Sequence, residues 1–193
     1  MAYPVIQPPF TLKFREMSDQ ELASYAQWLR AGTDERLDEL ESAVRATSGY
    51  ETWSATCTPE SLDTLGEWFA GAVTIRQRAL QEMADVKLRG DLLMSVPDGQ
   101  LTNETFSLAM DIGLYLARTF EHTHRNLTWK QFLDNKKFAD YGQPVLTGFG
   151  AVPLNPIRIA VTLAYGLASG TQAGKRLREL FDYWSNQVGN GKH

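Results

Sequence analysis

The segment from Asn103 to Gly170 constrains the fold more than any other part of the chain. It begins with a long apolar run of helical spacing, NETFSLAMDIGLYLARTFEHTH. It continues through two short β-prone runs, LTWKQFL and QPVLTGFG, and ends with a second apolar helix, NPIRIAVTLAYGLASG. A surface helix needs a broad polar face, and these two helices are too hydrophobic to have one. Other elements must cover them, so we expect them to form the interior of the protein.

Each expected helix has a start signal in the sequence. A capping box at Ser18 predicts a helix that ends near residues 31–32, and Thr33 predicts a second helix that ends near residue 49. A third helix is expected from the Thr58-Pro59 pair, since proline is tolerated at the first helical position. The remaining three helices are expected to start at Thr102 (the central helix, to about Glu121), Asn155 and Thr171.

Three segments are expected to form one small sheet. The stretch from Phe10 to Phe14 alternates apolar and polar residues, as a strand with one buried face does. The other two strands are expected around Trp129 and Val145, with Pro144 at a strand start or edge because it has no N–H to donate. The predicted fold class is therefore α+β, mainly helical, with an about three-stranded sheet covered by helices.

A chain of 193 residues is long enough for one domain with a full core, and we expect residues 1–193 to form a single domain. The clearest turn signals are Gly90-Asp91 and Pro97-Asp98-Gly99. They mark a candidate sub-boundary near residues 90–99, between a helical N-terminal half and a helix-strand-strand-helix C-terminal half.

Acidic residues are concentrated between Asp34 and Glu67. This segment holds nine Asp and Glu against two Arg, whereas the whole chain has a net charge of only -4. Such a surface repels nucleic acid and anionic lipid and attracts basic proteins. The other interpretation is a solvated face that aids solubility. The candidate partner-binding residues are Asp34, Asp38, Glu39, Glu41, Glu60 and Asp63, with Trp53 as an exposed aromatic anchor.

Several chemistries are excluded by what the sequence lacks. It has no apolar run of the roughly 18 residues that cross a bilayer, and its start is unlike a secretory signal, so we expect a cytoplasmic protein.

Cys57 is the only cysteine, which excludes an internal disulfide and a cysteine zinc cluster. His122 and His124 lie two residues apart and would diverge on a helix. The run at 170–176 departs from the phosphate-loop spacing. We expect no metal and no cofactor.

One polar stripe remains on the central helix. Asp111, Tyr115, Arg118 and His122 recur at helical spacing on an otherwise buried element. A buried acid beside Tyr and Arg can have a shifted pKa and transfer protons. A deep pocket lined by all four residues would indicate a small enzyme, whereas a structural ion pair or a wet helix face would not.

Four runs of the central segment are similar to a pattern in small uncharacterised bacterial cytoplasmic proteins: DIGLYLARTF, LTWKQF, YGQPVLTGF and LNPIRIAVTLA. In these proteins a helix of the form D-x-G-x-Y-L precedes two strands and an N-P-initiated helix, and some of them resemble immunity proteins of polymorphic toxin systems. The resemblance implies a helix-strand-strand-helix core over residues 103–170.

Together these features favour a non-catalytic protein-binding module. The specific expectation is an immunity protein that occludes the basic surface of a toxin, with the acidic segment docking on it. The alternatives are a small enzyme built around the polar stripe of the central helix and a scaffold or oligomerisation domain. The sequence leaves the oligomeric state open.

Overall fold

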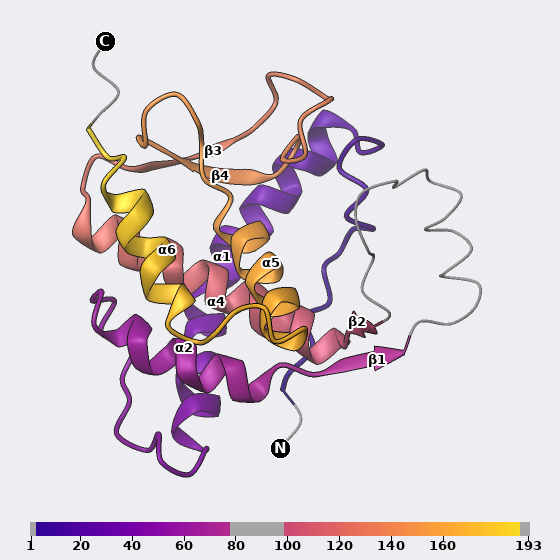
Figure 1. Cartoon of the computed structure of the whole chain (residues 1–193). Helices are drawn as coiled ribbons and strands as arrows, with labels where there is room; N and C mark the ends of the chain where they lie inside the picture. Colours follow the sequence, from indigo (N-terminus) through magenta and orange to yellow (C-terminus); the bar gives the residue numbers. More distant parts are fainter. Residues whose placement is uncertain (1–2, 78–98, 190–193) are drawn as a thin grey trace.

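The computed structural model describes residues 3–77 and 99–189. The elements are α1 (Asp19–Arg45), α2 (Ser61–Ala72), β1 (Ile75–Gln77), β2 (Gly99–Leu101), α4 (Asn103–Thr123), β3 (Thr128–Gln131), β4 (Pro144–Thr147), α5 (Pro156–Ala168) and α6 (Arg176–Ser185). These residues form a mainly helical α+β fold (Figure 1). None of the helices described is both long and apolar enough to span a membrane.

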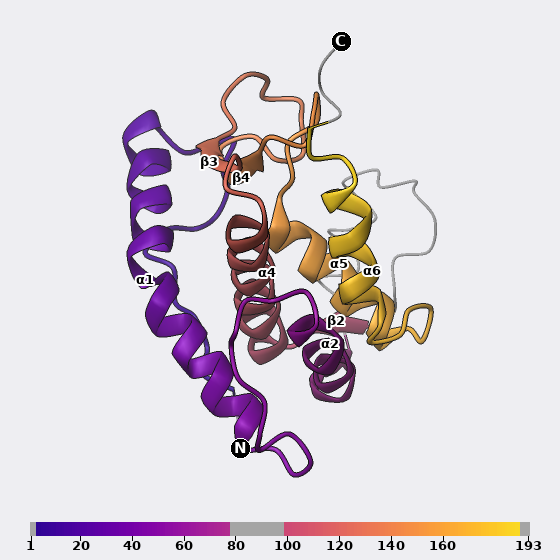
Figure 2. The same cartoon turned by 90° about the vertical axis from the view of Figure 1, so that its left-hand side faces the viewer.

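Helix α4 is the centre of the fold. Figure 2 shows it between the long α1 on one side and α2, α5 and α6 on the other. The Thr102 side chain accepts a hydrogen bond from the Thr105 backbone N–H, so α4 begins where its cap predicted. A Cβ atom at Gly113 would lie only 2.6 Å from the Ile157 Cα, which shows how closely α5 crosses α4. The expectation that these two apolar helices pack together in the interior is confirmed.

The sheet prediction is partly wrong. Strands β3 and β4 pair antiparallel, with Trp129 opposite Leu146, and Pro144 stands at the start of β4 as expected. The stretch from Phe10 to Phe14 forms no strand, because Leu12 has a φ of 58° and a turn follows it. A second antiparallel pair, β1 with β2, is present instead, so the described residues hold two two-stranded sheets and not one of three strands.

The expected break between the first two helices is also wrong. Helix α1 runs unbroken for 27 residues through Gly32 and Thr33. The Thr33 hydroxyl donates to the Leu29 carbonyl at 2.8 Å, one turn back, and caps nothing. A glycine inside a helix costs only about 1 kcal/mol, which the buried face of α1 easily outweighs.

Other helix boundaries differ by a few residues from their predictions. Helix α2 starts at Ser61, after a turn over residues 58–60, and α6 starts at Arg176 and not at Thr171. Thr171 instead bonds back to the Gly166 carbonyl at the end of α5. Most of the candidate boundary at 90–99 lies outside the described residues, and Gly99 begins β2.

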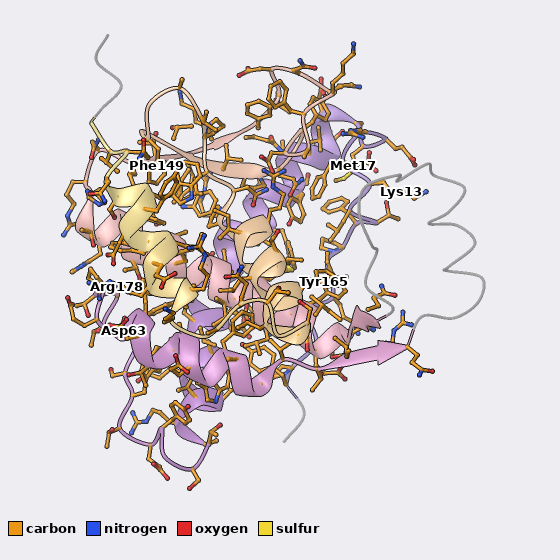
Figure 3. The ribbon with its side chains drawn as sticks, viewed as in Figure 1. Lys13, Met17, Asp63, Phe149, Tyr165 and Arg178 are labelled. Carbon is orange, nitrogen blue, oxygen red and sulfur yellow. The ribbon has the colours of Figure 1, made fainter. Side chains whose placement is uncertain are left out.

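The core has a main cluster and a small satellite. In the main cluster the rings of Phe120 and Phe181 stack at 4.6 Å, and Phe149 meets Phe120 edge-on at 5.2 Å. The satellite packs Met17 and Tyr25 near the start of α1. Figure 3 labels Phe149 beside α6 and Met17 near the start of α1. The main cluster fixes α4 against α5, α6 and β4, and thereby positions the polar groups described next.

Candidate functional site

Asp111 lies completely buried on α4 and holds three elements together. Its carboxylate accepts hydrogen bonds from Arg36 on α1, from Nε at 3.0 Å and from Nη2 at 2.5 Å, and from the Tyr3 hydroxyl at 2.6 Å. The Arg36 guanidinium also donates to the Pro4 carbonyl, and Ser107 on α4 accepts from the Ile6 N–H. The residues before α1 are thus fastened along the junction of α1 and α4.

The electrostatics of this triad are those of a structural cluster. Burial raises the pKa of Asp111, and the hydrogen bonds from Arg36 and Tyr3 oppose that change. Burial also raises the pKa of the Tyr3 hydroxyl, and the neighbouring Asp111 carboxylate raises it further. Burial disfavours the charge on Arg36, but its hydrogen bonds with Asp111 raise its pKa overall. The three groups bond to one another, and these contacts join the residues before α1 to α1 and α4.

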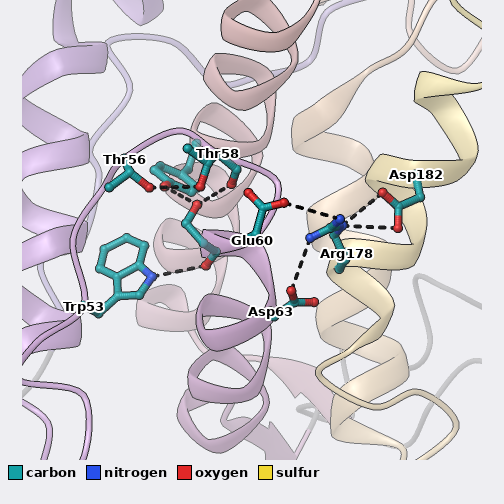
Figure 4. Close-up of polar contacts among 9 residues, drawn as sticks. Trp53, Thr56, Thr58, Glu60, Asp63, Arg178 and Asp182 are labelled. Carbon is teal, nitrogen blue, oxygen red and sulfur yellow. Dashed lines mark hydrogen bonds and ion pairs between the residues drawn. The ribbon is translucent and has the colours of Figure 1, made fainter.

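Tyr115 points toward the loop before α2. Its hydroxyl accepts from the Cys57 N–H at 3.0 Å and lies 2.7 Å from the Ser61 hydroxyl. Burial raises the pKa of Tyr115 and that of the Cys57 thiol, so neither is activated as a nucleophile. Trp53 is only 6% exposed, and its indole N–H donates to the Ser61 carbonyl (Figure 4). The expectation that Trp53 is an exposed anchor is therefore wrong.

The last two residues of the polar stripe, Arg118 and His122, lie away from both of these groups of contacts. Arg118 pairs with Asp34 of α1 at 2.6 Å on the surface, and His122 is exposed near the end of α4. A pocket of about 200 Å³ beside them is lined by Arg118, Glu121 and Trp129 among others, but by no other member of the stripe. The four side chains diverge and do not line one cavity. The enzymatic alternative required a single pocket lined by all four.

The two histidines near the end of α4 also diverge. His124 makes a hydrogen bond of 3.0 Å to the Ser185 hydroxyl of α6, whereas His122 is exposed. Within residues 3–77 and 99–189, no three His, Cys, Asp or Glu side chains gather as metal ligands.

Three of the candidate partner-binding acids form ion pairs with other residues of the chain. Asp34 holds Arg118, as described above. Asp63 on α2 and Glu60 just before α2 face Arg178 of α6, at 3.2 and 3.9 Å (Figure 4). These pairs join α1 to α4 and the start of α2 to α6. Arg178 also pairs with Asp182, so its one positive charge offsets only part of the charge of Glu60 and Asp63.

The other candidate acids lie together on α1. Asp38 and Glu39 are exposed and have no ion-pair partner in the described part of the chain, and Glu41 pairs only with its helical neighbour Arg45, at 3.6 Å. We call the adjacent Asp38 and Glu39 the acidic face of α1; Glu41, two residues beyond Glu39, points to another side of the helix. The acidic face, together with Glu35 and Glu67, is exposed and has no ion-pair partner among the described residues.

A cleft of about 620 Å³ adjoins this acidic face, between α1, the end of α2 and the first turn of α4. Its charged lining residues are Glu39 and Glu104, and its aromatic ones are Tyr3, Tyr50 and Trp68; no Lys, Arg or His is among the lining residues. We call it the acid-aromatic cleft. Sequence reasoning missed it, because its residues come from four separate segments.

Comparisons of the chain with protein-family models, with curated proteins and with solved structures found no match. The geometry and the charge of the described residues are therefore the basis for assigning a function.

Proposed function

We propose that this protein is a non-catalytic protein-binding module that uses the acidic face of α1 to dock on a basic surface of another protein. The observation that supports this most directly is the distribution of ion pairs. Glu60 and Asp63 at the start of α2 lie within ion-pair distance of Arg178, whereas Asp38 and Glu39 stay exposed and have no ion-pair partner in the described part of the chain. Uncompensated charge on one face steers a partner of opposite charge and raises the association rate.

The more specific proposal is an immunity protein that neutralises a toxin by covering the toxin's basic surface. The resemblance of residues 103–170 to small bacterial cytoplasmic proteins, some of them similar to immunity proteins, supports this proposal. Occlusion requires no reactive group, and Asp111, Tyr115 and Arg118 of the polar stripe each contact another part of the chain. We propose the bacterial cytoplasm as the compartment in which this happens.

Charge reversal on the acidic face tests this proposal. The protein would first be used to capture its partner from a lysate of its native cells, and the association rate would then be measured by surface plasmon resonance. The Asp38→Lys/Glu39→Lys variant is expected to associate roughly tenfold more slowly at low salt, because steering typically changes on-rates by ten- to a thousandfold. The difference should shrink above about 0.1 M salt, where the Debye length falls to about 10 Å.

A matched control separates the acidic face from net charge alone. Glu67 on α2 and Asp134 in the loop after β3 are exposed and have no ion-pair partner among the described residues. The Glu67→Lys/Asp134→Lys variant changes the net charge by the same amount and is expected to associate nearly as fast as the wild type. If both double variants slowed association equally, docking through the acidic face of α1 would be refuted.

A further inference from the structure

We propose that the acid-aromatic cleft receives an arginine or lysine side chain of the docked protein partner. This inference depends on the proposed function, because the cleft and the acidic face share Glu39. A partner held on the acidic face would therefore lie directly over the mouth of the cleft.

The cleft is large enough to admit a side chain from another protein. Its volume of about 620 Å³ falls within the roughly 300–1,000 Å³ of small-molecule sites. The walls carry small residues where α1 and α2 face each other: Ala43 on α1 and Ala46 just after it, and Gly71 and Ala72 on α2. An inserted side chain would contact these apolar walls along its length.

The charge of the cleft selects a cation. Glu39 and Glu104 come from different helices, line the same hollow, and have no ion-pair partner in residues 3–77 and 99–189. Glu104 lies in the first turn of α4, at the positive end of the helix dipole. An entering cation would meet two carboxylates and no Lys, Arg or His among the lining residues; Arg36, which lies over the Tyr3 ring, is paired with Asp111.

Two of the other polar groups of the walls already have partners. The Trp68 indole N–H donates to the Thr47 hydroxyl at 2.9 Å, and the Thr105 hydroxyl donates to the Thr74 carbonyl at 3.0 Å. The two carboxylates are the charged acceptors of the cleft. An uncharged ligand would desolvate them without compensating their charge.

An amphipathic cation matches this mixture of surfaces. Arginine and lysine pack their aliphatic stems on apolar walls while the charged head reaches polar groups, and aromatic rings attract the head further. The chain itself already shows such a contact on a ring that lines the cleft: the Arg36 guanidinium lies 5.7 Å from the centre of the Tyr3 ring.

The test uses a fluorescein-labelled peptide of twelve alternating arginine and glycine residues, titrated with the full-length protein in a fluorescence anisotropy assay. Glu104→Gln removes a charge from the cleft without touching the acidic face. It is expected to weaken peptide binding about tenfold, the typical effect of losing one charge-assisted hydrogen bond. Glu67→Gln removes the same charge from outside the cleft and is expected to weaken binding less than twofold.

A second variant tests the cleft without changing its charge. Ala43→Leu keeps a good helix former on α1 and fills the space between the walls, so it is also expected to weaken peptide binding, while circular dichroism confirms that it folds. If Glu104→Gln and Glu67→Gln bound the peptide equally well, the cleft would be refuted while docking on the acidic face would stand.

Two further outcomes test which ligand occupies the cleft. Wild-type protein that bound no peptide at low salt would refute docking through the acidic face as well as insertion into the cleft. Spermidine would be added as a competitor at the same concentration of positive charge as the peptide. If it displaced the peptide, and if Glu104→Gln weakened its binding as much as it weakened peptide binding, the cleft would take a free polyamine. Its assignment to a protein side chain would then be overturned.

Discussion

Replacing Asp111 by alanine is expected to lower the free energy of unfolding by about 3 kcal/mol. The Asp111 side chain is fully buried and the Arg36 side chain is 18% exposed, so the substitution would leave a mostly buried guanidinium without its partner. Breaking a buried pair in this way typically costs about 3–5 kcal/mol. We take the lower end because Arg36 still reaches water on one side.

The assay is chemical denaturation in urea, with thermal melting beside it. At about 2–4 °C per kcal/mol for a chain of this length, the melting temperature of Asp111→Ala should fall by roughly 6–12 °C. In the double variant with Arg36→Met, the second substitution removes the stranded charge, so the two effects should not add: the double variant is expected to be more stable than the sum of the single changes predicts.

The matched control is Asp34→Ala, which breaks the other ion pair between α1 and α4. Asp34 is 86% exposed in its pair with Arg118, and such surface pairs contribute at most about 1 kcal/mol. Similar losses for Asp111→Ala and Asp34→Ala would refute the idea that burial makes the Asp111 cluster the main polar connection between α1 and α4. Additive effects of Asp111→Ala and Arg36→Met would refute it as well.

Two helix glycines and one histidine give the remaining predictions. Gly32→Ala should stabilise the protein by about 1 kcal/mol, since nothing lies within 4 Å of a Cβ atom there, whereas Gly113→Ala should destabilise it by about 1–3 kcal/mol through its clash with α5. Urea titrations that gave both changes the same sign would contradict the packing at these two sites. Burial lowers the pKa of His124 from its ordinary 6.5, so the unfolded chain takes up this proton first as the pH falls. The stability that neutral His124 provides is present above pH 6.5 and lost below it. His124→Asn should therefore flatten the change in the free energy of unfolding between pH 7.5 and 5.5. An unchanged pH profile would count against a role of His124 in this change.

The elements that sequence reasoning located correctly have strong local signals. Thr102 caps α4, Asn155 caps α5 through a hydrogen bond to the Arg158 N–H, and Ser18 forms the capping box that starts α1. A cap and its target lie within three residues of each other, so the energy that decides the boundary is visible in a short stretch of sequence. The β3–β4 pair was predicted for a similar reason, from two β-prone runs close together in the chain.

The elements that were predicted wrongly depend on packing between distant residues. Gly32 and Thr33 are a plausible helix boundary in isolation, but Leu29 and Leu40 on either side of them are buried, and this keeps α1 in one piece. The alternation from Phe10 to Phe14 gives way to a turn whose apolar side chains pack against α1, including Leu22 and Tyr25. In both places tertiary contacts outweigh a local preference worth about 1 kcal/mol.

The candidate site was predicted only as a region of charge. The count of acids between residues 34 and 67 is a property of the sequence, but which of them stay free depends on Arg178, more than a hundred residues away from Asp63 and Glu60. The cleft has no signal in the sequence at all. Tyr3 and Glu104 line it together only because the residues before α1 are fastened to α4.

The buried cluster and the cleft are connected through one side chain. Tyr3 donates its hydroxyl to Asp111 in the interior, and its ring forms part of the cleft wall. The same contact that contributes to folding therefore also fixes an aromatic surface in place before any partner arrives. A wall that is already fixed loses little conformational entropy on binding, which raises affinity without any additional contact. This explains why a buried acid on α4 can matter for recognition although no partner could touch it.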